Sequence, residues 1–410
     1  LALGYRILRF ADDIAIPCTS ETQALDALVA VSDVLASLDL EPNDSKTQID
    51  DFDTGVAFLG TTLHAHGGSA VALERPKRMS LFVAGGGALV RLRKGSIRVD
   101  RDGETVAAAS LARVHQVVIQ GRVGLTTPFL HEALRSGVDV VLLSEGGGYL
   151  GRLNRRRGLD PTNKRAQFRA AEDPERALST ARLFVAGKIA NMRVAVLRAS
   201  RAGERSQKES AIADSLARTR DYVAEAENHS TLMGLEGSAT RAYFAWMRSR
   251  VGDRWGFESR QRRPPRDPVN AMLSYGYTIL TAEVISATEQ AGLDPDFGFL
   301  HSDRWGRPSL ALDLMEEWRP VIVDSVVLRI IATGQLEPVD FSYDPQTGCR
   351  LTDKSRRAFL EGYERRMLTR VSAGQAGIRE PYRRLLVRQA RQLAEHLVDP
   401  HLPYVSHLWR

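Results

Sequence analysis

The sequence has few cysteines, no long apolar run and no recognisable leader. Cys18 and Cys349 are the only cysteines among 410 residues, too few and too far apart for a disulfide framework or a thiolate zinc site, so we expect a reducing cytoplasm. No apolar run approaches the ~20 residues that cross a bilayer, which argues against a membrane protein. Residues 1–10 (LALGYRILRF) lack the regions of a secretory signal and an initiator Met, so we expect the chain to begin inside a longer one.

Lysine is also scarce. It accounts for seven of the 56 basic residues and the rest are arginine, in a chain of net charge +6 and pI near 9.4. Arginine binds phosphate bidentately, which favours a polyanionic partner. A GC-rich genome would give the same composition, and composition alone does not separate the two.

The length and the patterning predict an α+β protein of several domains, because single cores rarely exceed about 250 to 300 residues. Residues 1–64 contain a hairpin, a helix and short strands, and 65–79 form a linker. Residues 80–160 are β-rich, with short strands separated by glycine turns, and 161–410 are helical to the end. We therefore expect a small β domain followed by a large all-helical domain.

Local signals define one helix in the β-rich region. In TTPFLHEALRSG, Thr127 is the expected N-cap, Pro128 the first helical residue and Gly137 the terminator. The buried strand VDVVLL should follow. The glycines at 146–148 are predicted to form a turn, because no lysine or helix start follows them as in a phosphate-binding loop.

The helical region contains several long amphipathic stretches and two arginine-rich connectors. The connectors, 152–157 and 259–266, are either solvated surface runs or grips for phosphate. The expected helices are 174–199, 208–228, 237–250, 268–291, 310–333 and 381–398.

Two clusters of residues suggest chemistry. Near the start, Asp12 and Asp13 in FADDI lie at the tip of a predicted hairpin, where carboxylates can bind metal. Further on, Glu236 is expected at a helix start and His301 at the end of a Gly-rich loop. Asp313 and Glu316 are spaced i, i+3 on a helix that Ser309 would cap.

One histidine with carboxylates suits Mg²⁺ or Mn²⁺, which can polarise a phosphodiester. Each residue also has an ordinary explanation. Glu236 could cap its helix, His301 could donate a loop hydrogen bond, and the acids could complement the helix dipole.

Six motifs occur in order between about residue 80 and the end of the chain. They are VVIQGRVGLTTPFLHEALRSGVDVVLLSEGGGYLGRL, VAGKIANMR, GLEGSATRAYF, DPVNAMLSYGYTIL, GFLHSDRWGRPSLALDLMEEWRP and YRRLLVRQARQLAEHL. On these motifs the chain resembles the CRISPR-adaptation integrase family, Cas-one. The resemblance implies a β domain joined to a helical domain, with a metal held by Glu236, His301 and Glu316. Asp313 is the nearby acid, and spacing alone does not exclude Glu317 in place of Glu316.

The first 64 residues contain FADDI, NDSKT (43–47) and FLG (58–60) in that order. On these motifs the segment resembles the last palm motifs of group II intron-type reverse transcriptases. The resemblance implies that Asp12 and Asp13 are two metal-binding aspartates of the palm, whose third comes from a motif that this chain does not contain. A fusion of the two proteins explains the order, and the fragment should not synthesise DNA alone.

The resemblance implies joining of the 3′-hydroxyl ends of a short DNA duplex, the spacer precursor, to the CRISPR repeat by transesterification in a prokaryotic cytoplasm. Expected partners are double-stranded DNA, a second copy of the chain, a small ferredoxin-like Cas-two dimer and RNA through a complete polymerase domain. Two alternatives remain open: a piece of an RNA-dependent DNA polymerase for spacer capture from RNA, and a catalytically silent DNA-binding scaffold.

Overall fold

A computed structural model describes most of the chain, which divides into two compact units, Leu1–Lys77 and Arg78–Arg410. The described residues are 8–10, 13–16, 18, 21–36, 56–58, 61–63, 79–155, 161–199, 206–262, 264–301, 306–372 and 379–409.

The described part of the first unit forms two small hairpins and a helix. In its first hairpin Phe10 pairs with Asp13, as the FADDI pattern predicts. Asp12 and the NDSKT segment lie outside the described residues, as does the side chain of Asp13. The helix expected after the hairpin forms. The elements are β1 (Leu8–Phe10), β2 (Asp13–Ala15), α1 (Glu21–Ala36), β3 (Val56–Phe58) and β4 (Thr61–Leu63).

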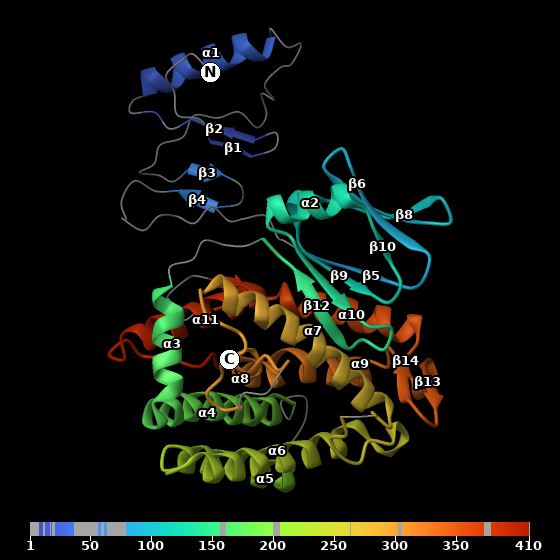
Figure 1. Ribbon diagram of the computed structural model, residues 1–410, viewed down its shortest axis with the longest axis vertical. Coiled ribbons are helices and arrows are strands. Elements are labelled where there is room, and N and C mark those ends of the chain that lie inside the picture. Colours follow the sequence, from blue (N-terminus) through green and yellow to red (C-terminus); the bar gives the residue numbers. More distant parts are fainter. Residues whose placement is uncertain are drawn as a thin grey trace. The chain divides into compact units, whose positions relative to one another are not determined.

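The second unit begins with two four-stranded sheets (Figure 1). One has the order β10-β6-β7-β8 and the other β12-β11-β9-β5, with β5, β9 and β11 parallel. All the predicted strands of this region form. The elements are β5 (Met79–Ala84), β6 (Ala88–Arg93), β7 (Ser96–Arg101), β8 (Glu104–Ser110), η1 (Leu111–Arg113), β9 (Val114–Gln120), β10 (Gly124–Leu125), α2 (Thr127–Ser136), β11 (Asp139–Leu143) and β12 (Tyr149–Leu153).

The helix α2 shows how well local signals predict its ends. Gly137 ends it in the left-handed conformation, with φ 68°, which glycine adopts at little cost. The N-cap is Thr126, one residue before the predicted Thr127, and its side chain makes no capping hydrogen bond. Residues 146–148 lie in a turn, as predicted.

The rest of the unit is mainly helical, with two hairpins that the sequence patterns did not predict. The elements are α3 (Thr162–Glu172), α4 (Pro174–Ala199), α5 (Gln207–Val223), α6 (His229–Val251), η3 (Asp253–Trp255), α7 (Pro268–Gln290), α8 (Ser309–Trp318), the π-helical η4 (Pro320–Asp324), α9 (Ser325–Ala332), η5 (Pro338–Asp340), β13 (Phe341–Asp344), β14 (Gly348–Leu351), α10 (Asp353–Met367), β15 (Arg370–Ser372), β16 (Arg379–Pro381) and α11 (Tyr382–Val398).

Four helix predictions need correction. The helix expected at 208–228 ends at Val223. The helix expected at 237–250 begins earlier, at His229, where the Asn228 side chain accepts the Thr231 N–H. The helix expected at 310–333 is divided by η4, because Pro320 cannot donate a backbone hydrogen bond. Ser309 is the first residue of α8, after Pro308, and is therefore not its cap.

Helix α4 lies between α5 and α6 on one side and α8 on the other (Figure 1). Helix α7 is buried on nearly every side; Val269, Leu273 and Leu280 are completely buried. Such a helix belongs to the interior of a large core. The layers bring α4, α6 and α8 together, which matters for the site below.

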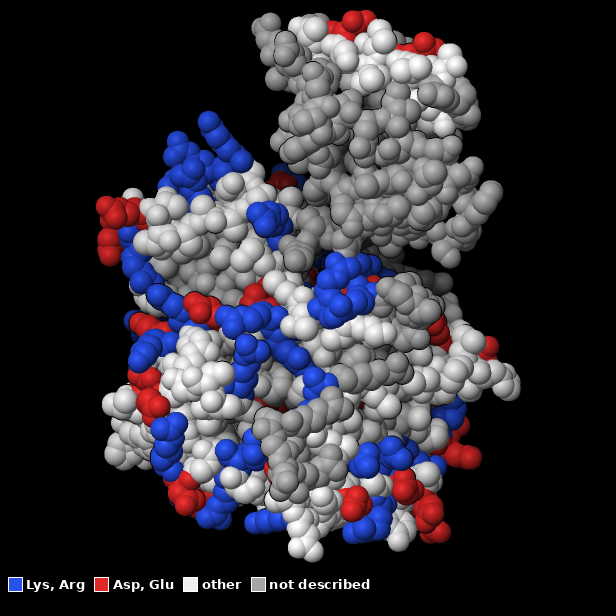
Figure 2. Space-filling view, turned by 180° about the vertical axis from the view of Figure 1, so that it is seen from behind, with Lys and Arg blue, Asp and Glu red and all other residues white. Residues whose placement is uncertain are grey.

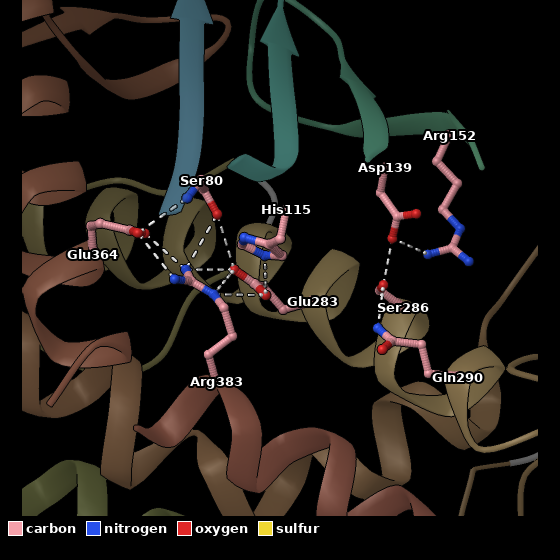
Figure 3. Close-up of polar contacts among 9 residues, drawn as sticks. All are labelled: Ser80, His115, Asp139, Arg152, Glu283, Ser286, Gln290, Glu364 and Arg383. Carbon is pink, nitrogen blue, oxygen red and sulfur yellow. Dashed lines mark hydrogen bonds and ion pairs between the residues drawn. The ribbon is translucent and has the colours of Figure 1, made fainter. Parts of the chain in front are cut away.

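A buried ionic network joins the β-rich part to α7, α10 and α11 (Figure 3). Arg383 lies 2.9 Å from Glu283 and 2.8 Å from Glu364. His115 of β9 contacts Glu283, and the Ser80 N–H of β5 donates to Glu364. Burial would raise the pKa of Glu283, but Arg383 and His115 hold it well below its usual range.

A second polar cluster lies at the other edge of the same sheet (Figure 3). Asp139 of β11 accepts a hydrogen bond from Ser286 of α7 and lies 3.5 Å from Arg152. Val118 of β9 and Val141 of β11 form a small apolar cluster with Ala282 of α7. The sheet is therefore fastened to α7 by apolar and polar contacts together.

Candidate active site

Glu236 lies inside α6, on the side of the helix that faces α4. The sequence patterns predicted it at a helix start, but seven residues of α6 precede it. One carboxylate oxygen accepts a hydrogen bond from Thr240, one turn further along, at 2.9 Å. The side chain is 17% exposed, so the carboxylate lies near the surface while it contacts the buried Lys188.

Lys188 of α4 connects two of the predicted site residues. Its Nζ contacts Glu236 Oε1 and lies 2.6 Å from Glu316 Oε2. Lys188 Nζ and Glu316 Oε2 are close enough for an ion pair, but their angles do not meet the geometry of a hydrogen bond. The Glu236 and Glu316 carboxylates, eighty positions apart, thus converge on one ammonium group.

Glu316 lies almost fully buried in α8 among cationic groups. Arg319, one turn along, lies 3.1 Å from its Oε1. Burial alone would raise the pKa of Glu316, but Arg319, Lys188 and His301 outweigh it and lower the pKa to about 2. The carboxylate is therefore charged over the whole physiological range.

Asp313 holds His301 in place. Its Oδ1 lies 2.6 Å from His301 Nδ1, and its two oxygens accept the backbone N–H groups of Phe299, Leu300 and His301. Because a carboxylate only accepts, the Nδ1 proton faces Asp313. In the neutral ring Nε2 is then a free electron-pair donor, 4.0 Å from Glu316 Oε1.

A glycine allows the His301 loop to approach α8 so closely. A Cβ on Gly298 would lie 2.8 Å from Asp313 Oδ2 and 2.8 Å from Ser309 Cβ. Both neighbours are fully buried, so a larger residue would push the loop off the helix. The GFLH motif therefore serves to place the histidine against Asp313.

Glu317, the alternative to Glu316, points in a different direction. It is completely buried, and it accepts hydrogen bonds from Tyr404 Oη and the His407 N–H at 2.5 and 3.2 Å. Burial raises its pKa to about 8 despite these bonds. Of the two adjacent glutamates, Glu316 is the one that shares contacts with Glu236 and His301.

The C-terminal strap, residues 401–409, packs against α4 and α8 beside the site. Asn191 of α4 joins the three segments: its amide donates to the carbonyls of Glu317 and His407 and accepts the Trp409 N–H. The His407 ring stacks on Trp318 at 4.7 Å. The strap thus supports the end of α8 that follows Glu316.

The donor set fits a hard divalent cation, although a lysine stands between two of its members. Two carboxylates and one imidazole nitrogen suit Mg²⁺ or Mn²⁺, and the Glu316 Oε2 without a directed hydrogen bond faces the shared space. Among the residues that the structure describes, no three His, Cys, Asp or Glu side chains already form a ligand group. The Lys188 ammonium contacts both Glu236 and Glu316.

Sequence reasoning missed two residues of the site, Lys188 and Arg319. The sequence could have indicated Lys188, since a single charged residue in an otherwise apolar stretch of α4, which includes Val185 and Ile189, is unusual. Arg319 follows Trp318 at the end of α8 and had no such signal. Its guanidinium lies 4.5 Å from the centre of the Tyr277 ring, a contact between distant segments.

The two arginine-rich connectors contain side chains with internal partners. Arg152 is 7% exposed and contacts Asp139 and Glu289. Arg260 donates to Asn270 and Ser274. These two arginines hold the fold together and are not available as phosphate contacts.

The α+β fold has a β-rich region before a helical one, with Glu236 and Glu316 on helices and His301 in the loop before α8. Residues 81–365 match the family model described as CRISPR associated protein Cas1. The chain therefore belongs to the Cas1 family. None of the described helices has the length and hydropathy to span a bilayer.

Curated relatives and a solved structure agree with this assignment. The chain is 38% identical over 332 residues to a CRISPR-associated endonuclease Cas1 of Thermus thermophilus, a match that covers 81% of this chain and 100% of the relative. It is 37% identical over 326 residues to a CRISPR-associated exonuclease Cas4/endonuclease Cas1 fusion of Geobacter sulfurreducens, covering 78% of this chain and 58% of the fusion. The chain thus spans little more than half of such a fusion.

One similar structure extends over almost the whole chain. It is titled Cas6-RT-Cas1--Cas2 complex, has a TM-score of 0.68 and 27% identity, and covers 99% of this chain and 46% of that one.

Proposed function

We propose that this chain is the metal-dependent integrase of CRISPR adaptation, which joins the 3′-hydroxyl ends of a short DNA duplex to the CRISPR repeat. The hydroxyl oxygen attacks a repeat phosphodiester and forms a new P–O bond, while the 3′-oxygen of the cut repeat strand leaves. One phosphodiester replaces another, so no external energy is required. The single observation that carries the proposal is that Glu236 and Glu316 meet at the Lys188 ammonium, while His301 Nε2 lies 4.0 Å from the other oxygen of Glu316.

Glu236, His301 and Glu316 would hold Mg²⁺ or Mn²⁺. When bound, the ion would polarise the scissile phosphate and offset charge on the leaving oxygen. The chain's own residues prepare the site: Asp313 fixes the His301 tautomer, and Arg319 fixes one oxygen of Glu316.

The composition and the surface support DNA as a partner. Lys and Arg side chains gather in a band across one face (Figure 2), and such a band favours the phosphate backbone. We also propose that the active form contains a second copy of the chain and a Cas2 dimer. The similar structure contains Cas2, and its title also names RT.

We further propose that residues 1–64 are the end of a reverse-transcriptase palm in which Asp12 and Asp13 bind metal. The FADDI hairpin and the similar RT-containing structure support this. The parent protein should extend a primer on RNA, whereas this chain should not. Primer extension by both proteins tests the proposal, and synthesis by this chain alone would contradict it.

The main test is a strand-transfer assay with a CRISPR-repeat plasmid and a labelled duplex, in Mn²⁺ and in EDTA. Wild type should join the strands only with the metal, and His301→Ala should not join them. His131→Ala, an exposed histidine of α2, is the matched control and should behave as wild type. Glu236→Ala separates an enzyme from a DNA-binding scaffold, because a scaffold would lose no strand transfer.

A further inference from the structure

We propose that the Lys188 ammonium is the resident cation of the candidate active site in the metal-free protein, and that a divalent ion must displace it to bind. This inference rests on the proposed metal-dependent function. It starts from one arrangement: Nζ contacts Glu236 Oε1, lies 2.6 Å from Glu316 Oε2, and belongs to a side chain that is 6% exposed.

Lys188 is buried beside apolar residues, and its ammonium group pairs with the carboxylates of Glu236 and Glu316. Val185 and Ile189 of α4 are completely buried on either side of it. A buried ammonium is costly unless it is paired and hydrogen-bonded. Conversely, Glu236 and Glu316 would repel each other across the shared space without a cation. Lysine and glutamates therefore stabilise one another when no metal is bound.

Of the two cations at Glu316, Lys188 is the one that can leave. Arg319 covers the other oxygen, Oε1, and its guanidinium lies over the Tyr277 ring at 4.5 Å. Lys188 has a flexible stem of four carbons with a compact charge at its end. Movement of that stem frees Glu236 and Glu316 Oε2 together, which are the oxygens that face the shared space.

Lys188 is thus a positioning residue. It keeps the carboxylates together before the metal arrives, and it competes with the metal for them. Because two cations that compete for one site lower each other's affinity by the same factor, removal of the ammonium should tighten metal binding. It should also destabilise the metal-free protein, because Glu236 would lose its ion-pair partner and Glu316 would depend on Arg319.

The experiment compares wild type, Lys188→Met and Lys354→Met by thermal unfolding of the purified chain, in EDTA and during titration with MnCl₂. Lys354 is a matched control because it also pairs with a carboxylate, that of Asp340, but is 69% exposed. In EDTA, K188M should melt below wild type. Its dissociation constant for Mn²⁺ should be lower than that of wild type by roughly tenfold or more. K354M should match wild type in both.

The outcomes separate this inference from the proposed function. If wild type responds to Mn²⁺ but K188M binds it no more tightly, the inference is overturned and the metal site stands. If wild type does not respond to Mn²⁺ at all, the metal site itself is wrong, and the inference with it.

A wild-type measurement keeps the test valid should K188M fail to fold. An amine-reactive reagent, read out by mass spectrometry, should modify Lys188 faster in Mn²⁺ than in EDTA, because displacement releases its Nζ from the carboxylates. Lys354 should react at the same rate in both. Equal rates for Lys188 with and without Mn²⁺ would overturn the inference.

Discussion

His301 and Asp313 are joined by a 2.6 Å contact between Nδ1 and Oδ1, although twelve positions separate them in the sequence. The same carboxylate accepts three successive backbone N–H groups, those of residues 299–301. One buried acid therefore sets the position of the loop, the orientation of the ring and the nitrogen that remains available. Partners of this kind govern how well a histidine serves a metal.

Asp313→Asn should lower strand transfer by about 10- to 100-fold while the chain still folds. An amide offers one acceptor oxygen where the carboxylate uses two, so the loop donors and the ring cannot all be satisfied. The strand-transfer assay measures the loss, and circular dichroism checks the fold. Asp353→Asn is the control, since that side chain is 94% exposed. Unchanged activity in D313N would contradict the positioning role.

Arg383→Met should destabilise the protein by about 3 to 5 kcal/mol, because it leaves buried acids without their counter-charge. Glu283 and Glu364 are the acids concerned. Urea unfolding measures the change. The neighbouring Arg384, 44% exposed and paired with Glu380 at 3.5 Å, provides a control whose loss should stay below about 1 kcal/mol. Equal effects of the two substitutions would show that the network does not fasten the sheet to the helices.

Asn191→Ala should release the C-terminal strap. The substitution removes three hydrogen bonds between α4, α8 and the strap, and we expect a loss of about 2 kcal/mol. Hydrogen exchange by mass spectrometry should show faster exchange in residues 401–409 than in wild type. If exchange in the strap is unchanged while overall stability falls, Asn191 acts within α4 alone.

Asp324→Asn should flatten the dependence of stability on pH. Burial raises the pKa of Asp324 from 3.8 to about 6, against the lowering effect of the hydrogen bond from Tyr277. The folded state therefore binds the proton more tightly than the unfolded chain. The stabilisation that this proton gives to the folded state is complete below about pH 4 and is lost as the pH rises through about 6.

Urea unfolding at about pH 4.5 and about pH 7.5 tests this prediction. Between these two pH values the unfolding free energy of wild type should fall by about 2 kcal/mol more than that of D324N. The asparagine retains an oxygen for the Tyr277 hydroxyl, so the hydrogen bond itself is kept. Parallel pH profiles for the two proteins would show that Asp324 does not titrate in this range.

Local patterns predicted much of the secondary structure. The strands at residues 81–120 and the ends of α4 follow from alternation, periodicity and glycine turns. The predictions failed where a longer-range contact or a single residue overrides the periodicity. The start of α6 at His229 depends on an Asn228 cap that the apolar pattern did not indicate. The break after α8 depends on Pro320 in an otherwise continuous helical pattern.

The sequence alone identified the candidate site residues. Glu236, His301, Asp313 and Glu316 each lie within a short motif, and a short motif can be recognised without knowledge of the fold. The contacts among these side chains could not be predicted from the sequence, because they depend on the packing of α4, α6 and α8. From their spacing alone, Glu316 and Glu317 were equally possible metal ligands. The fold separated them, since neighbouring residues on a helix point about 100° apart, toward Lys188 and toward the strap. Lys188 itself acquired a role only when two distant carboxylates reached it.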